Sequence, residues 1–305
     1  MKEIVYLSGL PRSGSTLLAN LLAMHPDIRS TPSSPLCTIV QNMRKHWSNE
    51  AFLKSQLDSN FDVVYERLKR TTRAAMNAWS FEYEDDIEIV VDKNRGWTFC
   101  LEWLRDLYPD FKMIITLRDL RNIYASEEKI HRKTLMLDFP DGMEHNIVDV
   151  RASALFEDNG IIGSCLKAVY NIGDIPDIVD HLLLWRYEDL FEDPQKAMDK
   201  TFDFLGIEPF RFDFDHIVQS TTETDSYHNM KFPHAVKTKL TKPLGFEEAK
   251  ISPRILQQIV KKYQWYYQAY YPEFFVNQPS SSPVVSTEEQ NMIQELEAAI
   301  KAEAE

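Results

Sequence analysis

Cysteine is scarce in this 305-residue sequence, basic residues are fewer than acidic ones, and long apolar runs are absent. The three cysteines, Cys37, Cys100 and Cys165, are widely spaced, odd in number and without a C-x-x-C pattern. This usage argues against a disulfide framework and a zinc site, and fits a reducing, cytoplasmic environment. No window approaches the roughly 20 apolar residues that cross a bilayer, and no basic leader precedes an apolar stretch. We therefore expect no membrane span.

Acidic residues outnumber basic ones by 47 to 34, which gives a net charge of −13 at pH 7. We expect no extended nucleic-acid binding, because such binding needs broad basic surfaces. Any positive potential for an anionic ligand must therefore be local. The apolar fraction of 44% in a chain of this length allows a large core to be buried.

A glycine-containing loop follows the first apolar run, residues 4–7, and leads into a leucine-rich stretch with helical composition. Backbone N–H groups at a helix start bind anions, most often phosphate. Gly9 and Gly14 match the nucleotide-binding G-x-x-x-x-G spacing, but Ser15 stands where an ATP- or GTP-binding loop has lysine. We expect Arg12 to supply the missing charge, because its planar guanidinium binds phosphate or sulfate in a bidentate manner.

The segment Pro-Arg-Ser-Gly-Ser-Thr resembles the 5′-phosphosulfate loop of sulfotransferases, which use 3′-phosphoadenosine 5′-phosphosulfate (PAPS) and release adenosine 3′,5′-bisphosphate (PAP). A chance glycine turn is the alternative. The resemblance implies an α/β fold in which helices flank a parallel sheet, the P-loop NTPase-like sulfotransferase fold. It also implies cofactor contacts from five consecutive loop residues, namely Arg12, Ser13, Gly14, Ser15 and Thr16.

A second match begins with the apolar run 114–117, which ends at Arg118. Asp119 is the expected N-cap of a helix that follows. The family's 3′-phosphate site resembles this segment, with an arginine at the strand end and a serine eight residues later. The resemblance implies that Arg118 and Ser126 donate to the 3′-phosphate. A surface ion pair and a solvated serine are the alternative.

A third match is the Arg-Tyr-Glu-Asp-Leu segment at 186–190, followed by a helix that is bracketed by Pro194 and Gly206. Family members carry a similar segment, much of which serves packing. The resemblance leaves two roles open for Tyr187, which either contacts the cofactor or fills a wall of the site.

A fourth match is Lys93, at the end of the apolar run 89–91. Ligands of open α/β sheets collect at the carboxyl ends of strands, so Lys93 is expected beside the first loop. The family often has a lysine near the transferred group, which implies that Lys93 neutralises charge on the bridging oxygen. A solvated lysine at a strand exit is the alternative.

The general base is not evident from the motifs. Tyrosylprotein sulfotransferases, which this chain resembles through Pro11–Asp27, have a catalytic glutamate in the loop after the first helix. Counting from the shared His-Pro-Asp, the matching position here is Ser33, so this chain departs from that pattern. Cytosolic phenol and steroid sulfotransferases have a histidine beyond the second strand, near Asp92 here. Asp92 and His131 are the two candidates for the base.

Apolar runs that alternate with helical stretches predict a parallel sheet with helices on both faces. Strands are expected at Ile4–Ser8, Ile87–Val91, Phe111–Leu117 and His181–Trp185. Helices are expected at Thr16–Met24, Leu36–Trp47, Phe61–Trp79, Thr98–Tyr108, Leu120–Arg132 and Pro253–Tyr267.

We assign residues 1–276 to one sulfotransferase domain, with a helical insertion around 134–172 that walls the acceptor pocket. Residues 277–286 are rich in proline and serine and are expected to form a linker. Residues 287–305 are expected to form an amphipathic helix. It packs on its own domain, forms an oligomer contact with another protomer, or remains a frayed tail.

A late segment is unusually basic for this chain, with His228, Lys231, His234, Lys237, Lys239 and Lys242. Cytosolic family members close a basic loop over the 3′-phosphate at a similar place, and a solvated lysine-rich loop is the alternative.

Taken together, the resemblance implies direct sulfuryl transfer from PAPS to a hydroxyl or amine of a small-molecule, carbohydrate or peptide acceptor. Arg12, Lys93 and the loop N–H groups would stabilise the leaving group without a metal. Two alternatives remain open. One is a magnesium-dependent kinase of a small molecule, and the other is a nucleotide-binding protein of the same fold that has lost turnover.

Overall fold

The computed structural model describes residues 2–82, 86–137, 147–220, 223, 238–243 and 245–276. The chain divides into two compact units, Met1–Ile259 and Val260–Glu305. The predicted linker and C-terminal helix lie outside the described residues. No helix in the described part of the chain is both long enough and apolar enough to cross a membrane.

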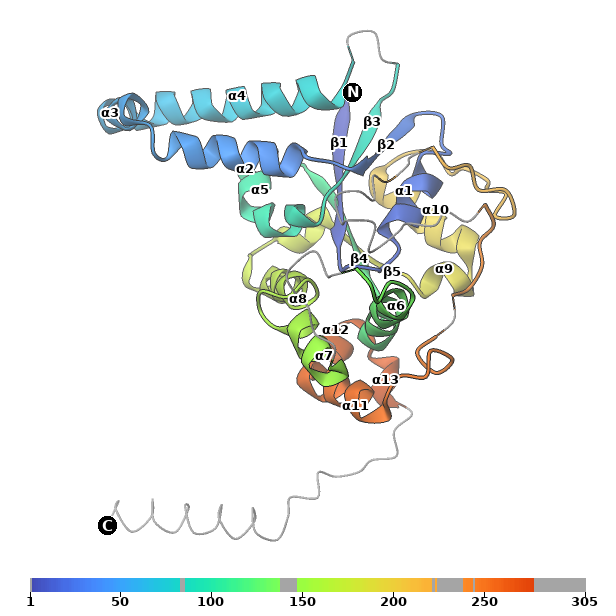
Figure 1. Ribbon diagram of the computed structural model, residues 1–305. Coiled ribbons are helices and arrows are strands. Elements are labelled where there is room, and N and C mark those ends of the chain that lie inside the picture. Colours follow the sequence, from blue (N-terminus) through green and yellow to red (C-terminus); the bar gives the residue numbers. More distant parts are fainter. Residues whose placement is uncertain are drawn as a thin grey trace, which may run out of the picture. The chain divides into compact units, whose positions relative to one another are not determined.

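A five-stranded parallel sheet forms the centre of the larger unit (Figure 1), with the strand order β2-β3-β1-β4-β5. The strands are β1 (Glu3–Gly9), β2 (Ile28–Ser33), β3 (Ile89–Lys93), β4 (Lys112–Leu117) and β5 (Leu182–Arg186). Helices flank the sheet, which confirms the predicted fold class. The edge strand β2 was not predicted, because its sequence Ile-Arg-Ser-Thr-Pro-Ser is largely polar and contains a proline, which edge strands tolerate.

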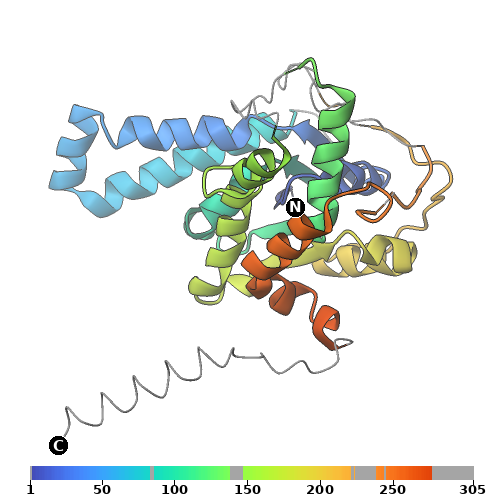
Figure 2. The ribbon, with the colours of Figure 1, turned by 60° about the horizontal axis from the view of Figure 1, so that its bottom comes forward.

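The α-helices are α1 (Ser15–Leu22), α2 (Leu36–Trp47), α3 (Ala51–Ser59), α4 (Phe61–Ser80), α5 (Leu101–Leu107), α6 (Leu120–Lys133), α7 (Val148–Phe156), α8 (Gly163–Tyr170), α9 (Asp189–Glu192), α10 (Pro194–Leu205), α11 (Pro253–Lys262), α12 (Gln264–Tyr270) and α13 (Glu273–Val276). The 3₁₀ helices are η1 (Arg95–Cys100), η2 (Asn171–Asp174) and η3 (Ile178–His181). Helices α2 and α4 lie side by side and are joined through α3 (Figures 1 and 2).

Three predicted helices are each divided into two in the structure. The helix expected at 98–108 starts as η1 and continues as α5. The helix expected in the insertion is two helices, because at Gly160 the chain turns so closely that a Cβ would clash with the Ala154 carbonyl. The helix expected at 253–267 is interrupted at Tyr263.

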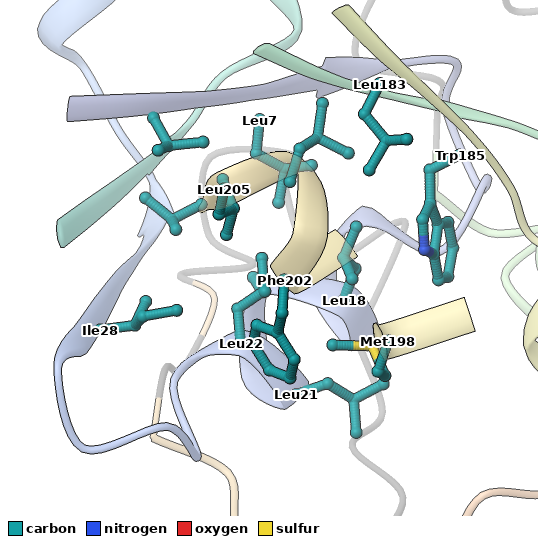
Figure 3. Close-up of a cluster of buried hydrophobic side chains, with 14 of the residues drawn as sticks. Leu7, Leu18, Leu21, Leu22, Ile28, Leu183, Trp185, Met198, Phe202 and Leu205 are labelled. Atoms are coloured by element: carbon teal, nitrogen blue, oxygen red, sulfur yellow. The ribbon is translucent and has the colours of Figure 1, made fainter. Parts of the chain in front are cut away.

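One face of the sheet carries an apolar cluster that joins β1, β3 and β5 to α1 and α10 (Figure 3). Val5 and Leu7 of β1 point into it, because alternate residues of a strand share a face. Phe202 of α10 is fully buried in the same cluster.

The opposite face of the sheet is covered by η1. The Tyr6 and Trp97 ring centroids are 4.7 Å apart, and the hydroxyls of Ser8 and Thr98 are 2.5 Å apart. The central strand β1 is therefore buried on both faces, which explains its nearly continuous apolar sequence.

At Gly9 the end of β1 lies in very close contact with β4. Gly9 has a φ of 130°, and a Cβ there would clash with the backbone of Thr116. The next residue, Leu10, donates its N–H to the Thr116 carbonyl at 3.0 Å. Only glycine allows this approach together with this backbone conformation.

We predict that Gly9→Ala lowers the free energy of unfolding by at least about 2 kcal/mol, because it adds both backbone strain and a clash. Urea denaturation measures this change. Gly173→Ala is the matched control, since a Cβ there meets no atom within 4 Å. Its effect should stay within about 0.5 kcal/mol. Equal, small effects of the two substitutions would contradict the close-contact argument.

Candidate functional site

The carboxyl ends of four neighbouring strands meet at one edge of the sheet (Figure 1). Lys93 lies two residues beyond Val91 of the apolar cluster, and Tyr187 lies two residues beyond Trp185. Because side chains alternate between faces, both residues are on the α1 side of the sheet. Arg118, directly after β4, joins them there with its guanidinium carbon 4.5 Å from the Tyr187 ring centroid.

The loop between β1 and α1 is held down by the buried hydroxyl of Ser13. This hydroxyl donates to the Leu10 carbonyl at 2.5 Å and lies 2.6 Å from the Thr116 hydroxyl. The Ser13 side chain is therefore committed to the fold, which leaves its backbone N–H for a ligand. Arg12 and Gly14 on either side have φ values of 57° and 92°.

Gly14 is the N-cap of α1 and provides no side-chain oxygen to accept from the first turn. Ser15 and Thr16 start the helix, so their backbone N–H groups belong to the set that has no partner within the helix. Such groups at a helix N-terminus attract anions. The loop therefore has the backbone geometry that an anion site requires.

Three segments converge on this loop. The Arg12 Nε donates to Ser126 Oγ of α6 at 3.2 Å, and an Arg118 Nη donates to the Arg12 carbonyl at 2.8 Å. The Tyr187 ring lies against Gly14, where a Cβ would clash with it. Burial raises the pKa of Tyr187, so its phenol is neutral at pH 7. The structure thus brings together residues that are up to 175 positions apart, from Arg12 to Tyr187 (187 − 12).

These residues line a cavity of about 850 Å³. Its described lining includes seven basic side chains, which are Arg12, Arg118, Lys129, Arg132, Lys133, Lys239 and Lys242. Glu248 is the one acidic side chain among the described lining residues. A chain with a net charge of −13 therefore has a strongly basic cavity at the carboxyl edge of its sheet, which attracts anions locally.

Residues 239–243, 248 and 249 form one wall of this cavity, and residues 246 and 249 are hydrogen-bonded to α6. The Phe246 N–H donates to Asn122 Oδ1 at 3.0 Å, and an Arg132 Nη donates to the Ala249 carbonyl at 3.0 Å. Lys239 and Lys242, from the basic segment singled out in the sequence, are at the cavity. The other members of that segment, His228, Lys231, His234 and Lys237, lie outside the described residues.

Lys93 lies beside the loop and is buried. Its Nζ donates to Thr16 Oγ1 at 3.0 Å and forms an ion pair with Glu223. Burial lowers the pKa of Lys93, and the carboxylate of Glu223 opposes that shift. Lys93 thus provides a positive charge next to the first turn of α1.

Sequence reasoning missed Glu223. Its carboxylate accepts from the Ser33 N–H at 3.0 Å and from Thr16 Oγ1 at 3.3 Å, in addition to Lys93. Burial favours a higher pKa for Glu223, but the charge of Lys93 and the hydrogen bonds from Lys93 and Ser33 lower it overall. Glu223 and Ser33 are 190 positions apart, and no local motif surrounds Glu223, so the sequence offered no signal for it.

The structure places both candidates for the base away from the cavity lining. Asp92 is on the η1 face of the sheet, opposite Lys93, and its Oδ1 accepts from Trp97 Nε1 at 2.8 Å. His131 is buried on α6, whereas Ser126, Lys129 and Lys133 form the face of that helix that lines the cavity. The strand pleat turns Asp92 to the face opposite Lys93, and the helical period turns His131 away from the cavity.

We predict that Asp92 makes stability depend on pH. Burial, the main cause, raises the pKa of Asp92 from 3.8 to about 6. The folded state therefore binds this proton more tightly than the unfolded chain, and the resulting stabilisation is complete below about pH 4 and lost as pH rises through about 6. Asp92→Asn should remove this loss in denaturation curves measured across that range. The exposed control Asp180→Asn should keep the wild-type dependence, and an unchanged curve for Asp92→Asn would refute the assignment.

The fold and the site define an α/β protein with a basic cavity at the carboxyl edge of a parallel sheet. The chain belongs to the sulfotransferase family, whose family model matches residues 5–211.

Individual relatives are distant. Protein-tyrosine sulfotransferase 1 of Danio rerio is 25% identical over 204 residues, which are 67% of this chain and 53% of that protein. Protein-tyrosine sulfotransferase A of Caenorhabditis elegans is 22% identical over 203 residues, 67% of this chain and 50% of that protein. The chain thus spans about half the length of these two relatives. The solved structure of a sulfotransferase from Alicyclobacillus acidocaldarius is 14% identical and covers 75% of this chain and 90% of that chain, with a TM-score of 0.45.

Proposed function

We propose that this protein transfers a sulfuryl group from PAPS to a hydroxyl or amine acceptor and releases PAP. The observation that carries the proposal is the convergence of Arg12, Arg118 and Ser126 in one basic cavity beside the loop after β1. Two neighbouring anion subsites match a donor that has one anionic group at each end of its ribose. The family to which the chain belongs supports the same chemistry.

In this proposal the phosphosulfate end of PAPS lies on the loop. The backbone N–H groups of residues 13–16 and the Arg12 guanidinium bind its oxygens. Arg118 and Ser126 bind the 3′-phosphate. Tyr187 fills the wall between the loop and Arg118, which accounts for its contact with both.

The reaction is an in-line displacement at sulfur. The acceptor oxygen or nitrogen forms a bond to sulfur while the bond from sulfur to the bridging oxygen breaks, and PAP leaves with the electron pair. Negative charge grows on the bridging oxygen and the 5′-phosphate. Preorganised donors at that place lower the barrier more than they stabilise the bound donor. We assign this role to Arg12, Lys93 and the loop N–H groups, and propose that no metal takes part.

The acceptor is proposed to be a small molecule, a carbohydrate or a peptide, and the compartment to be the cytoplasm. The departure at Ser33 from the glutamate of tyrosylprotein sulfotransferases leaves peptide tyrosine as one candidate among several.

We predict that PAP binds in the presence of EDTA and that ATP, which has no 3′-phosphate, binds more weakly. Arg118→Ala should weaken PAP binding by about 1.5–3 kcal/mol, the usual worth of a charged hydrogen bond. The same variant should leave the affinity for adenosine 5′-monophosphate unchanged. Calorimetry measures all of these affinities, and the exposed Arg211→Ala is the matched control. If Arg118→Ala weakened the binding of PAP and of adenosine 5′-monophosphate equally, Arg118 would have no specific role in binding the 3′-phosphate.

We predict that Arg12→Ala lowers turnover at least about a hundredfold, by analogy with the loss of one oxyanion-hole donor. The reason is that its guanidinium meets charge that develops in the transition state. Arg12→Lys should keep part of the rate, because a point charge remains without the fork geometry. Single-turnover kinetics at saturating PAPS tests this prediction. An alanine variant whose sole defect is weaker PAPS binding would show that Arg12 only anchors the donor.

A further inference from the structure

The carboxylate of Glu223 has an unusual place in this basic site. Its side chain is 5% exposed and reaches the first turn of α1 from a segment that follows all five strands. One oxygen contacts Lys93 and Thr16, and the other accepts from the Ser33 N–H. A buried carboxylate between a lysine and an anion loop costs desolvation energy, so its presence needs an explanation.

We propose that Glu223 is the general base that removes the proton from the acceptor. This inference rests on the proposed sulfotransferase function. Lys93 and Thr16 mark where the transferred group lies in that proposal, and Glu223 contacts both of them. A base must lie within hydrogen-bond reach of the attacking atom, and the attacking atom lies next to sulfur.

Ser33 gives the Glu223 carboxylate a second point of attachment, besides its contacts with Lys93 and Thr16. The Glu223 carboxylate is hydrogen-bonded to the backbone of Ser33. A distant segment thus supplies a carboxylate where the local sequence has only a hydroxyl.

The acceptor O–H gives its proton to a carboxylate oxygen of Glu223, and the acceptor oxygen uses its electron pair to form the bond to sulfur. The bond from sulfur to the bridging oxygen breaks, and PAP leaves with that pair. Glu223 then returns the proton to solvent, which restores the carboxylate.

The ion pair with Lys93 affects the protonation state of Glu223. The lysine charge lowers the pKa of Glu223 and so favours the carboxylate, which is the form that accepts a proton. When PAPS binds, its anionic group becomes a second partner for Lys93. The pull of Lys93 on the carboxylate then weakens, and the basicity of Glu223 rises.

The test compares two acceptors with wild type and Glu223→Gln. At about pH 8, phenol is protonated and needs a base, whereas 4-nitrophenol is largely ionised and does not. We expect Glu223→Gln to lower turnover with phenol at least about a hundredfold, and turnover with 4-nitrophenol less than about fivefold. Release of labelled sulfate from PAPS to water should fall as well, a readout that needs no organic acceptor. PAP affinity should not change, and the exposed control Glu192→Gln should match wild type throughout.

Three results with Glu223→Gln would overturn the inference. Equal losses of turnover with phenol and 4-nitrophenol would show that Glu223 has a structural role. Unchanged turnover with phenol would show that Glu223 is not the base. Tighter PAPS binding by Glu223→Gln with unimpaired turnover would show that the carboxylate only blocks the site. Failure of the wild-type protein to release sulfate or to modify either phenol, despite PAP binding, would instead refute the proposed transferase function, and the inference would fall with it.

Discussion

The hydroxyl of Ser13, which bonds to the Leu10 carbonyl and the Thr116 hydroxyl, connects the anion loop to the neighbouring strand β4. Close contact between Gly9 and the Thr116 backbone makes this possible. Because Arg118 follows Thr116 by two residues, the same contact sets where Arg118 stands relative to the loop, and its bond to the Arg12 carbonyl results. The loop and the proposed 3′-phosphate site are therefore one mechanical unit, in which a shift of β1 against β4 would displace both.

Strand pleating decides which side chains reach this unit. Lys93 and Tyr187 extend the same alternation that buries Val91 and Trp185 in the apolar cluster. The packing that stabilises the α1 face thereby also orients the site. Asp92 lies on the other face for the same reason, and its carboxylate accepts a hydrogen bond from Trp97 there. One strand register thus places the Lys93 side chain on the α1 face of the sheet and the Asp92 side chain on the η1 face.

Much of this arrangement follows from local sequence. Apolar runs that end in polar residues predicted four strands, and Pro194 and Gly206 marked the ends of α10, where Gly206 has the expected left-handed conformation. Because side chains alternate along a strand and Val91 is apolar, the sequence could also have placed Asp92 on the face opposite Lys93. Two features were beyond local reasoning. The polar edge strand β2 is stabilised by pairing rather than by its own pattern, and Glu223 gains its place through long-range contacts alone.

The charge distribution also pairs Glu223 with the buried Lys93. A buried lysine without a partner would lose its proton or pull its strand end toward water. The Glu223 carboxylate prevents this, because it pairs with Lys93. An incoming anion needs to displace only that pairing, since the Ser33 N–H continues to hold the other carboxylate oxygen. The pairing thereby favours the charged form of Lys93, and in the proposed mechanism the carboxylate remains where a proton acceptor is needed.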